Sequence, residues 1–176
     1  MHREIEAKIL DIDPEKVQEK LRALGAALEE ELDLEQVVWW AGDRARSSIR
    51  VRRSSDGIVR IIMKRDASEG LGYHEWECDV SDYETAIAIV DALVSVPDLR
   101  IEFSHHRQDW RLDGALINID WFPKIAPLVE IEAESEEKIR SLAEKLGFNP
   151  SLLVNKGVVS LLYEALGLKK GDRVKI

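Results

Sequence analysis

The sequence has little of several residue types, and each scarcity narrows the classes of protein to which it can belong. Only one of its 176 residues is cysteine, Cys78, so no disulfide can form within the chain and a reducing compartment is expected. No apolar run approaches the roughly 20 residues that a membrane-spanning helix needs. The N-terminal residues also lack the apolar core of a signal peptide. These features predict a cytoplasmic protein that does not enter a membrane.

Basic residues are also fewer than acidic ones. The sequence has 25 Lys and Arg and 34 Asp and Glu, which gives a net charge of −9. Nucleic-acid backbones favour basic surfaces, so this balance argues against nucleic acid as a partner. A small anionic ligand stays compatible with it, because the local charge of a site decides such binding. At this length one domain spanning residues 1–176 is expected. Composition does not choose between a monomer and a homodimer.

What the chain does contain is charge that alternates along strands. Residues 2–10 place Glu4, Glu6 and Lys8 on one face, with apolar side chains on the other. Near the far end, residues 129–133 repeat the pattern with Glu130 and Glu132. Two such strands predict carboxylates turned toward one shared space, which suits metal ions and a polyanion.

The strands between these two also carry charged faces, and the charges on any one face are either basic or acidic. A strand over residues 48–53 places Arg50 and Arg52 on one face, and the return strand 59–65 does the same with Arg60 and Lys64. Residues 73–80 form a further acidic strand with Glu75 and Glu77 on one face, and Arg107 lies in a strand over residues 99–112. Turn signals at residues 54–57 and 113–114 join neighbouring strands.

Helical spacing of apolar residues predicts helices over residues 14–24, 83–94, 136–147 and 150–166, which with about eight strands gives an α+β fold. Two architectures fit this pattern. In an ordinary sandwich the charged faces meet water. In an inverted barrel they point inward around an aqueous cavity, and helices cover the apolar faces outside. A closed barrel of about eight strands has room for one small ligand.

Seven segments, in order, resemble the CYTH family, also called triphosphate tunnel metalloenzymes. They are Glu4–Lys8, Ile49–Arg52, Met63–Lys64, His74–Glu77, His106–Trp110, Ile119–Pro123 and Leu128–Glu132. This family includes class IV adenylate cyclases, thiamine triphosphatases and inorganic triphosphatases. The resemblance implies a closed eight-stranded antiparallel β-barrel with a charged interior, in which a triphosphate binds together with Mg²⁺ or Mn²⁺.

The resemblance also implies roles for individual residues. Arginine forks match phosphate oxygens, and Mg²⁺ prefers oxygen ligands. The expected triphosphate-binding cations are Lys8, Arg50, Arg52, Lys64 and Arg107, and the expected metal ligands are Glu4, Glu6, Asp120, Glu130 and Glu132. Lys8 and Glu130 are expected to be catalytic. Glu75 and Glu77 are expected to pair with the arginines and orient them.

Two departures from the family pattern leave the substrate open. His105 stands where the family often carries Lys, and the segment that ends in Trp39 and Trp40 is altered. Two roles are open for these tryptophans. One of them stacks on a base or thiazole ring of the ligand, or both pack in the protein core. Trp76, on the apolar face of its strand with Cys78, is expected to pack under a helix, and Cys78 to be a buried structural thiol. Lys156, in the last predicted helix, lies at the tunnel mouth or on a solvated helix surface.

The function these observations favour is a metal-dependent hydrolase of inorganic, thiamine or nucleoside triphosphate. The first alternative is a class IV adenylate cyclase that uses the same phosphate-binding residues on ATP. The second is a module that binds polyphosphate or a nucleotide without turnover. The clustered carboxylates favour an enzyme, because a pure polyanion binder has little use for them.

Overall fold

The computed structural model describes residues 2–41, 47–66, 73–94 and 97–176. The strands are β1 (His2–Glu4), β2 (Glu6–Ile9), β3 (Ala27–Trp40), β4 (Ser47–Ser54), β5 (Val59–Asp66), β6 (Tyr73–Asp79), β7 (Leu99–Leu112), β8 (Ala115–Trp121), β9 (Leu128–Glu132) and β10 (Asp172–Lys175). The helices are α1 (Pro14–Ala23), α3 (Tyr83–Leu93), α4 (Glu136–Lys145) and α5 (Val158–Ala165), with a 3₁₀ turn η1 (Pro150–Leu152).

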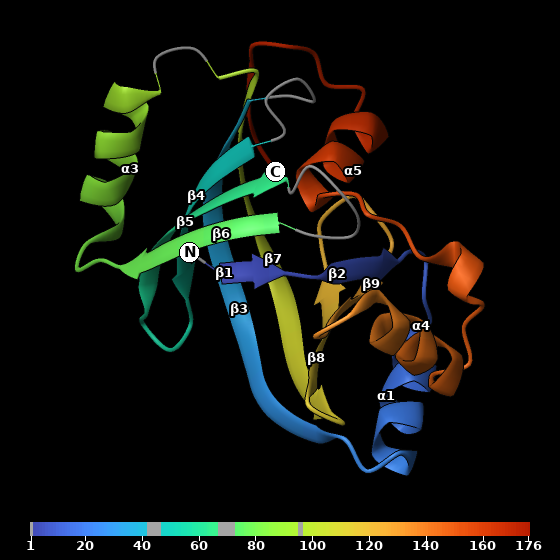
Figure 1. The fold of residues 1–176 in the computed structure, drawn as a ribbon. Helices are drawn as coiled ribbons and strands as arrows, with labels where there is room; N and C mark the ends of the chain where they lie inside the picture. The colour runs from blue at the N-terminus through green and yellow to red at the C-terminus, as the bar shows by residue number, and fades with distance from the viewer. Residues whose placement is uncertain (1, 42–46, 67–72, 95–96) are drawn as a thin grey trace.

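All the strands belong to one strongly curled sheet, ordered β1-β6-β5-β4-β3-β7-β8-β9-β2 (Figure 1). Every neighbouring pair in this order is antiparallel. The hairpin from β7 to β8 turns at Asp113 and Gly114, both at positive φ, which matches the twist of the flanking strands. Strand β10 lies outside this order and pairs in parallel with β7.

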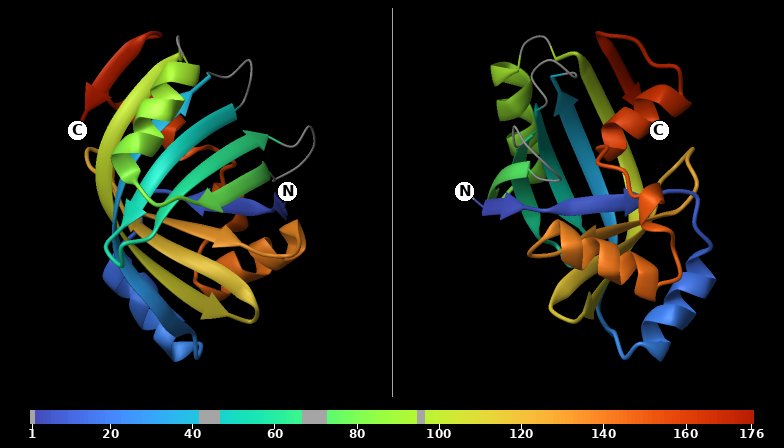
Figure 2. Two further views of the ribbon diagram at one scale, coloured as in Figure 1. Left: turned by 90° about the vertical axis from the view of Figure 1, so that its left-hand side faces the viewer. Right: turned by 45° about the vertical axis from the view of Figure 1, so that its right-hand side comes forward.

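The N-terminal segment joins the two edges of this sheet. Strand β1 pairs with β6, whereas β2, just beyond Ile5, pairs with β9. The pairing of β1 stops at Glu75, so the rest of β6 has no neighbour on that side among the described residues. Figure 2 shows the N-terminal strands crossing the open side of the curl. The fold is therefore a half-barrel held across one interrupted strand, and the predicted closed barrel overstates its closure.

The inverted arrangement of charged and apolar faces is confirmed. Outward-facing residues such as Ala7, Ile117 and Ile131 are fully buried in a core that includes Leu21 of α1 and Leu142 of α4. A second outer core forms where α3 covers β3 and β4. Because helices take up the apolar outer faces, the charged faces of the same strands point into the hollow.

Helix α5 breaks this rule, because it packs against the concave face. Leu162 joins a cluster with Phe103 and Phe122 at one end of the hollow. The predicted helix over residues 150–166 is therefore wrong in part. It is divided by an extended segment in which Val154 bridges to Lys8, and Lys156 precedes α5 rather than lying within it.

The outer face of β6 is not covered as expected. Trp76 is 40% exposed and Cys78 is exposed, so the predictions of a packed tryptophan and a buried thiol are wrong. The physical reason is the position of α3, whose core takes residues from β3, β4 and β5 but none from β6. Among the described residues, none of the helices has the length and apolar character to span a membrane.

Candidate functional site

The concave face of the sheet encloses a cavity of about 470 Å³, within the size range of small-molecule sites. Its lining includes the inward-facing residues of the curled strands and residues 155–160 before and within α5. The predicted site residues that line it are Glu4, Glu6, Lys8, Arg50, Arg52, Lys64, Glu75, Glu77, Arg107, Glu130 and Glu132. Of the predicted set, only Asp120 is not among them.

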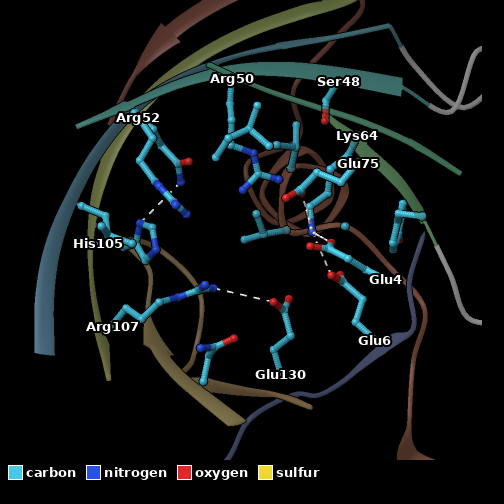
Figure 3. Close-up of a pocket in the computed structure, with 18 of the residues that line it drawn as sticks. Glu4, Glu6, Ser48, Arg50, Arg52, Lys64, Glu75, His105, Arg107 and Glu130 are labelled. Carbon is cyan, nitrogen blue, oxygen red and sulfur yellow. Dashed lines mark hydrogen bonds and ion pairs between the residues drawn. The ribbon is translucent and has the colours of Figure 1, made fainter. Parts of the chain in front are cut away.

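One side of the cavity is an acidic wall, formed by Glu4, Glu6, Glu75, Glu130 and Glu132 with two lysines among them. At its centre the Lys64 Nζ lies 2.6 Å from a Glu4 oxygen, 2.9 Å from Glu6 and 3.2 Å from Glu75 (Figure 3). Burial alone would lower the pKa of Lys64, but Glu6 and Glu130 raise it. The ammonium group therefore stays charged and holds strands β1, β2 and β6 together.

Lys8 makes a second bridge in the acidic wall. Its Nζ lies 2.6 Å from a Glu6 oxygen and 2.5 Å from a Glu130 oxygen. Burial would lower the pKa of Lys8, but Glu130 and Glu6 raise it above its usual range. Lys8 therefore stays protonated in this site, as a cation that donates hydrogen bonds rather than a base.

The lysines do not neutralise the acidic wall. Burial raises the pKa of Glu132 to about 7, and the nearby Glu4 adds to the rise. Burial also raises the pKa of Glu4. Five carboxylates share two ammonium groups here, and an elevated carboxyl pKa is the expected sign of such uncompensated charge.

The acidic wall suits a divalent cation in its chemistry. Glutamate oxygens are the ligands that Mg²⁺ and Mn²⁺ prefer, and a cation would stabilise the charged form of Glu132, whose pKa is raised by burial and by the neighbouring carboxylates. In the residues that the structure describes, no three acidic, histidine or cysteine side chains already stand in a metal-binding arrangement. Oxygens of Glu4, Glu6 and Glu130 instead contact the two lysines, so a metal would have to take over some of these contacts.

The opposite side is an arginine wall, formed by Arg50, Arg52 and Arg107. Within the described part of the chain neither Arg50 nor Arg52 has a carboxylate at ion-pair distance, and the buried Nε of Arg50 has no hydrogen-bond partner. Burial, followed by the charges of Arg107 and Arg50, lowers the pKa of Arg52 to about 10. These cations repel one another, so an anion between them would stabilise the wall.

Arg107 is held from behind by Asp120. Its Nε and Nη2 donate to the two oxygens of this carboxylate, both at 2.7 Å. Burial would raise the pKa of Asp120, but Arg107 and His105 hold it well below its usual range. Asp120 is fully buried and is not among the residues that line the cavity, and its role as a metal ligand stays a prediction. On the other side, Nη2 of Arg107 lies 3.8 Å from Glu130 and links the two walls.

The supporting glutamates differ from each other. Glu75 contacts Lys64, not an arginine as expected. Glu77 lies 3.9 Å from Arg60, a cavity residue that itself bonds to Asp79. Glu77 is therefore only loosely tied to an arginine.

Several residues that line the cavity carried no strong signal in the sequence. They are Gln36, Trp40, Arg60, His105, Asp109, Asn118 and Lys156. Strand parity alone would place most of them inward, but it does not separate a cavity residue from a core residue on the same face. Trp39 is buried and donates to Asp91, whereas Trp40 faces the cavity, so only Trp40 is placed to contact a ligand.

The half-barrel and its two charged walls define the class of protein. The CYTH domain family matches residues 2–157, and the chain belongs to this family. Members of the family are triphosphatases or adenylate cyclases. No curated protein is significantly similar to the chain.

Solved structures with the same fold come from distant organisms. A protein from Pyrococcus horikoshii OT3 is similar with a TM-score of 0.78 and 21% identity, covering 90% of this chain and 98% of its own. A candidate adenylate cyclase from Vibrio parahaemolyticus has a TM-score of 0.72 and 12% identity, covering 90% and 97%. A candidate adenylyl cyclase from Hippeastrum, which shows a dominant triphosphatase activity, has a TM-score of 0.63 and 14% identity, covering 96% and 97%.

Proposed function

We propose that this chain is a divalent-metal-dependent triphosphatase that binds a small-molecule triphosphate in the cavity. The observation that carries the proposal is the separation of charge. Arg50 and Arg52 face the hollow with no acidic partner among the described residues, opposite carboxylates that share too few cations. A triphosphate bound with Mg²⁺ or Mn²⁺ brings an anion to the first wall and a cation to the second.

The arginine wall would bind the phosphate oxygens. Arg50, Arg52 and Arg107 come from two strands on one side of the hollow, so their guanidinium groups converge on one space (Figure 3). Planar guanidinium groups bind phosphate through two hydrogen bonds at once, which fixes the orientation of the chain of phosphates. Lys64 and Lys8 would contact the same ligand from the acidic side.

The acidic wall would serve the reaction. Glu4, Glu6, Glu130 and Glu132 are the residues proposed to hold the metal, which when bound neutralises phosphate oxygens and lowers the pKa of an attacking water. Lys8, protonated between Glu6 and Glu130, would stabilise negative charge on the transferred phosphoryl group. Glu130, between Lys8 and Arg107, would orient the water. Phosphoryl transfer needs mainly this positioning and charge stabilisation.

Adenylate cyclase activity is the second candidate, and one observation favours it. Trp40 lines the cavity and pairs across the sheet with Ser48, another lining residue. An indole ring at this position offers a stacking surface for a nucleobase. A cyclase would bind the same phosphates but direct the ribose 3′-hydroxyl at the α-phosphorus.

One experiment separates these functions. The purified protein is incubated with Mg²⁺ or Mn²⁺ and, in turn, inorganic triphosphate, thiamine triphosphate and ATP, and phosphate, pyrophosphate and cyclic AMP are quantified. We expect phosphate release, with inorganic triphosphate or another simple triphosphate turned over better than ATP. Cyclic AMP with pyrophosphate as the main products would make the protein a cyclase. Binding without any product would leave a non-catalytic polyphosphate-binding module.

The single cysteine fits a reducing compartment, so we place this activity in the cytoplasm.

A further inference from the structure

Behind Arg107 lies a row of polar side chains that are shielded from solvent. Gln36 is 1% exposed, His105 7% and Asp120 0%. The His105 Nε2 lies 3.4 Å from Asp120, and its Nδ1 lies 3.5 Å from the Gln36 amide nitrogen. The row therefore runs from β3 through β7 to β8 and ends on the guanidinium of Arg107.

The chemistry of Asp120 explains why His105 belongs to this row. A buried carboxylate is costly unless its oxygens are well satisfied. Arg107 supplies one hydrogen bond to each oxygen, and the remaining contact on Oδ1 comes from His105. The His105 Nε2 lies 3.4 Å from Oδ1, and because a carboxylate only accepts, a hydrogen on this nitrogen is the one that can point to it.

The imidazole ring is also fixed in place. It stacks on Phe122 with the ring centroids 4.3 Å apart and the planes 22° from parallel. Both ring nitrogens face a protein partner, Asp120 on one side and Gln36 on the other. His105 therefore has no ring nitrogen turned to a ligand, although its side chain forms part of the cavity lining.

We infer that His105 is a positioning residue, which acts through Asp120 to hold the Arg107 guanidinium in the orientation that binds a phosphate group. The inference rests on the proposed function in one respect, that the cavity takes a triphosphate. Asp120 fixes the Nε and Nη2 edge of the fork, so the other donors of Arg107 face the cavity. His105 holds the Asp120 carboxylate in the orientation in which it accepts both hydrogen bonds from the Arg107 guanidinium.

The test begins with two substitutions at one position. His105→Leu fills the site with apolar atoms but removes the donor to Asp120, whereas His105→Gln places an amide N–H near the position of Nε2. The matched control is His106→Leu, because His106 lies on the opposite face of β7 and contacts Glu31 and Asp33 outside the cavity. The probe is inorganic triphosphate, titrated calorimetrically in EDTA so that metal binding does not contribute.

We expect His105→Leu to weaken triphosphate affinity about tenfold, the usual effect of a lost hydrogen bond to a charged group. His105→Gln and His106→Leu should stay within about twofold of the wild type. The NMR signal of the Arg107 Nε–H should exchange faster with water in His105→Leu alone. That signal reports the Arg107–Asp120 bond in the absence of ligand.

A double-mutant cycle separates positioning from a general loss of packing. Arg107→Lys keeps a cation beside Asp120 but removes the planar guanidinium group. Adding His105→Leu to Arg107→Lys should therefore weaken triphosphate affinity by less than about twofold. An undiminished tenfold loss there, or unchanged affinity and exchange in His105→Leu, would overturn the inference while the wild type still binds triphosphate. A wild type that does not bind triphosphate would overturn the proposed function and this inference together.

Discussion

The two walls of the cavity solve the problem of buried charge in different ways. In the acidic wall, Lys8 and Lys64 each contact two or more glutamates within 3.2 Å, so the charges largely hold one another. In the arginine wall, Arg107 has Asp120, but Arg50 and Arg52 have no such partner among the described residues.

This difference shows what each wall contributes before any ligand binds. The acidic wall is a network that joins the sheet edges at β1, β2, β6 and β9, and its excess negative charge appears only in Glu132 and Glu4. The arginine wall depends on a ligand for its counter-charge. Substitutions in the acidic wall should therefore affect metal-dependent turnover and stability, and substitutions in the arginine wall should affect affinity.

The largest effect is expected from neutralising the acidic wall. Glu132→Gln or Glu4→Gln should abolish metal-dependent turnover and leave the fold intact, because each replaces an oxygen proposed to bind the metal and removes one of several like charges. Turnover of triphosphate is measured against Mg²⁺ concentration, with folding followed by circular dichroism. Glu144→Gln, an exposed position on α4, is the control. Near wild-type turnover at limiting Mg²⁺ would show that these residues do not bind the metal.

The next effect comes from the arginine wall. Arg52→Ala should reduce triphosphate affinity about ten- to hundredfold, because a charge-assisted hydrogen bond contributes roughly 1.5–3 kcal/mol. Arg53→Ala is the matched control, since Arg53 lies on the outer face of the same strand and bonds to Glu35. Calorimetric titration measures both variants. Equal losses of affinity in the two variants would show that the assignment of the Arg52 face of β4 to the ligand is mistaken.

A smaller effect should appear in the pH dependence of stability without metal. Because the pKa of Glu132 is about 7 in the fold, the protonated form favours folding, and its contribution is lost as pH rises through 7. The raised pKa of Glu4 acts in the same direction. The urea midpoint in EDTA should therefore fall between pH 5 and pH 8. This fall should be weaker in Glu132→Gln, and an unchanged slope in that variant would assign it to other groups.

The smallest effect is expected at Arg60, which lines the cavity but resembles neither wall. It is partly exposed and already bonded to Asp79 at 2.8 Å, so Arg60→Ala should lower triphosphate affinity no more than about twofold. The same titration checks it beside Arg52→Ala. A tenfold loss of affinity would show that Arg60, on β5, binds the triphosphate as the arginine wall does.

Strand parity explains why much of this site was predictable. Alternation placed Glu4, Glu6 and Lys8 on one face, and Arg50 and Arg52 on another, and all five line the cavity. The packing of apolar outer faces beneath helices followed from the same patterns. The incomplete closure of the curled sheet could not be predicted from these patterns, because the interruption at Ile5 sends β1 and β2 to different partner strands.

Where the structure differs from what the sequence suggested, the reason is that parity gives a face but not its surroundings. Asp120 does point inward, yet Arg107 and His105 enclose it. Trp76 and Cys78 do lie opposite Glu75, yet both are exposed, since none of the described helices covers that part of β6. The role of His105 depends on side chains from β3 and β8, and such a contact between distant segments leaves no local pattern.

The crossing of residues 2–9 over the open side has a consequence for the order of folding. Glu6 pairs with Glu132, and Lys8 bridges to Val154, so these contacts close very long loops. Contacts of such long range form slowly, because loop-closure entropy opposes them until the rest of the sheet exists. Residues 6–9 therefore depend for their pairing on strand β9 and on the segment at Val154, far along the sequence. We therefore expect the contacts of the acidic wall to form late in folding.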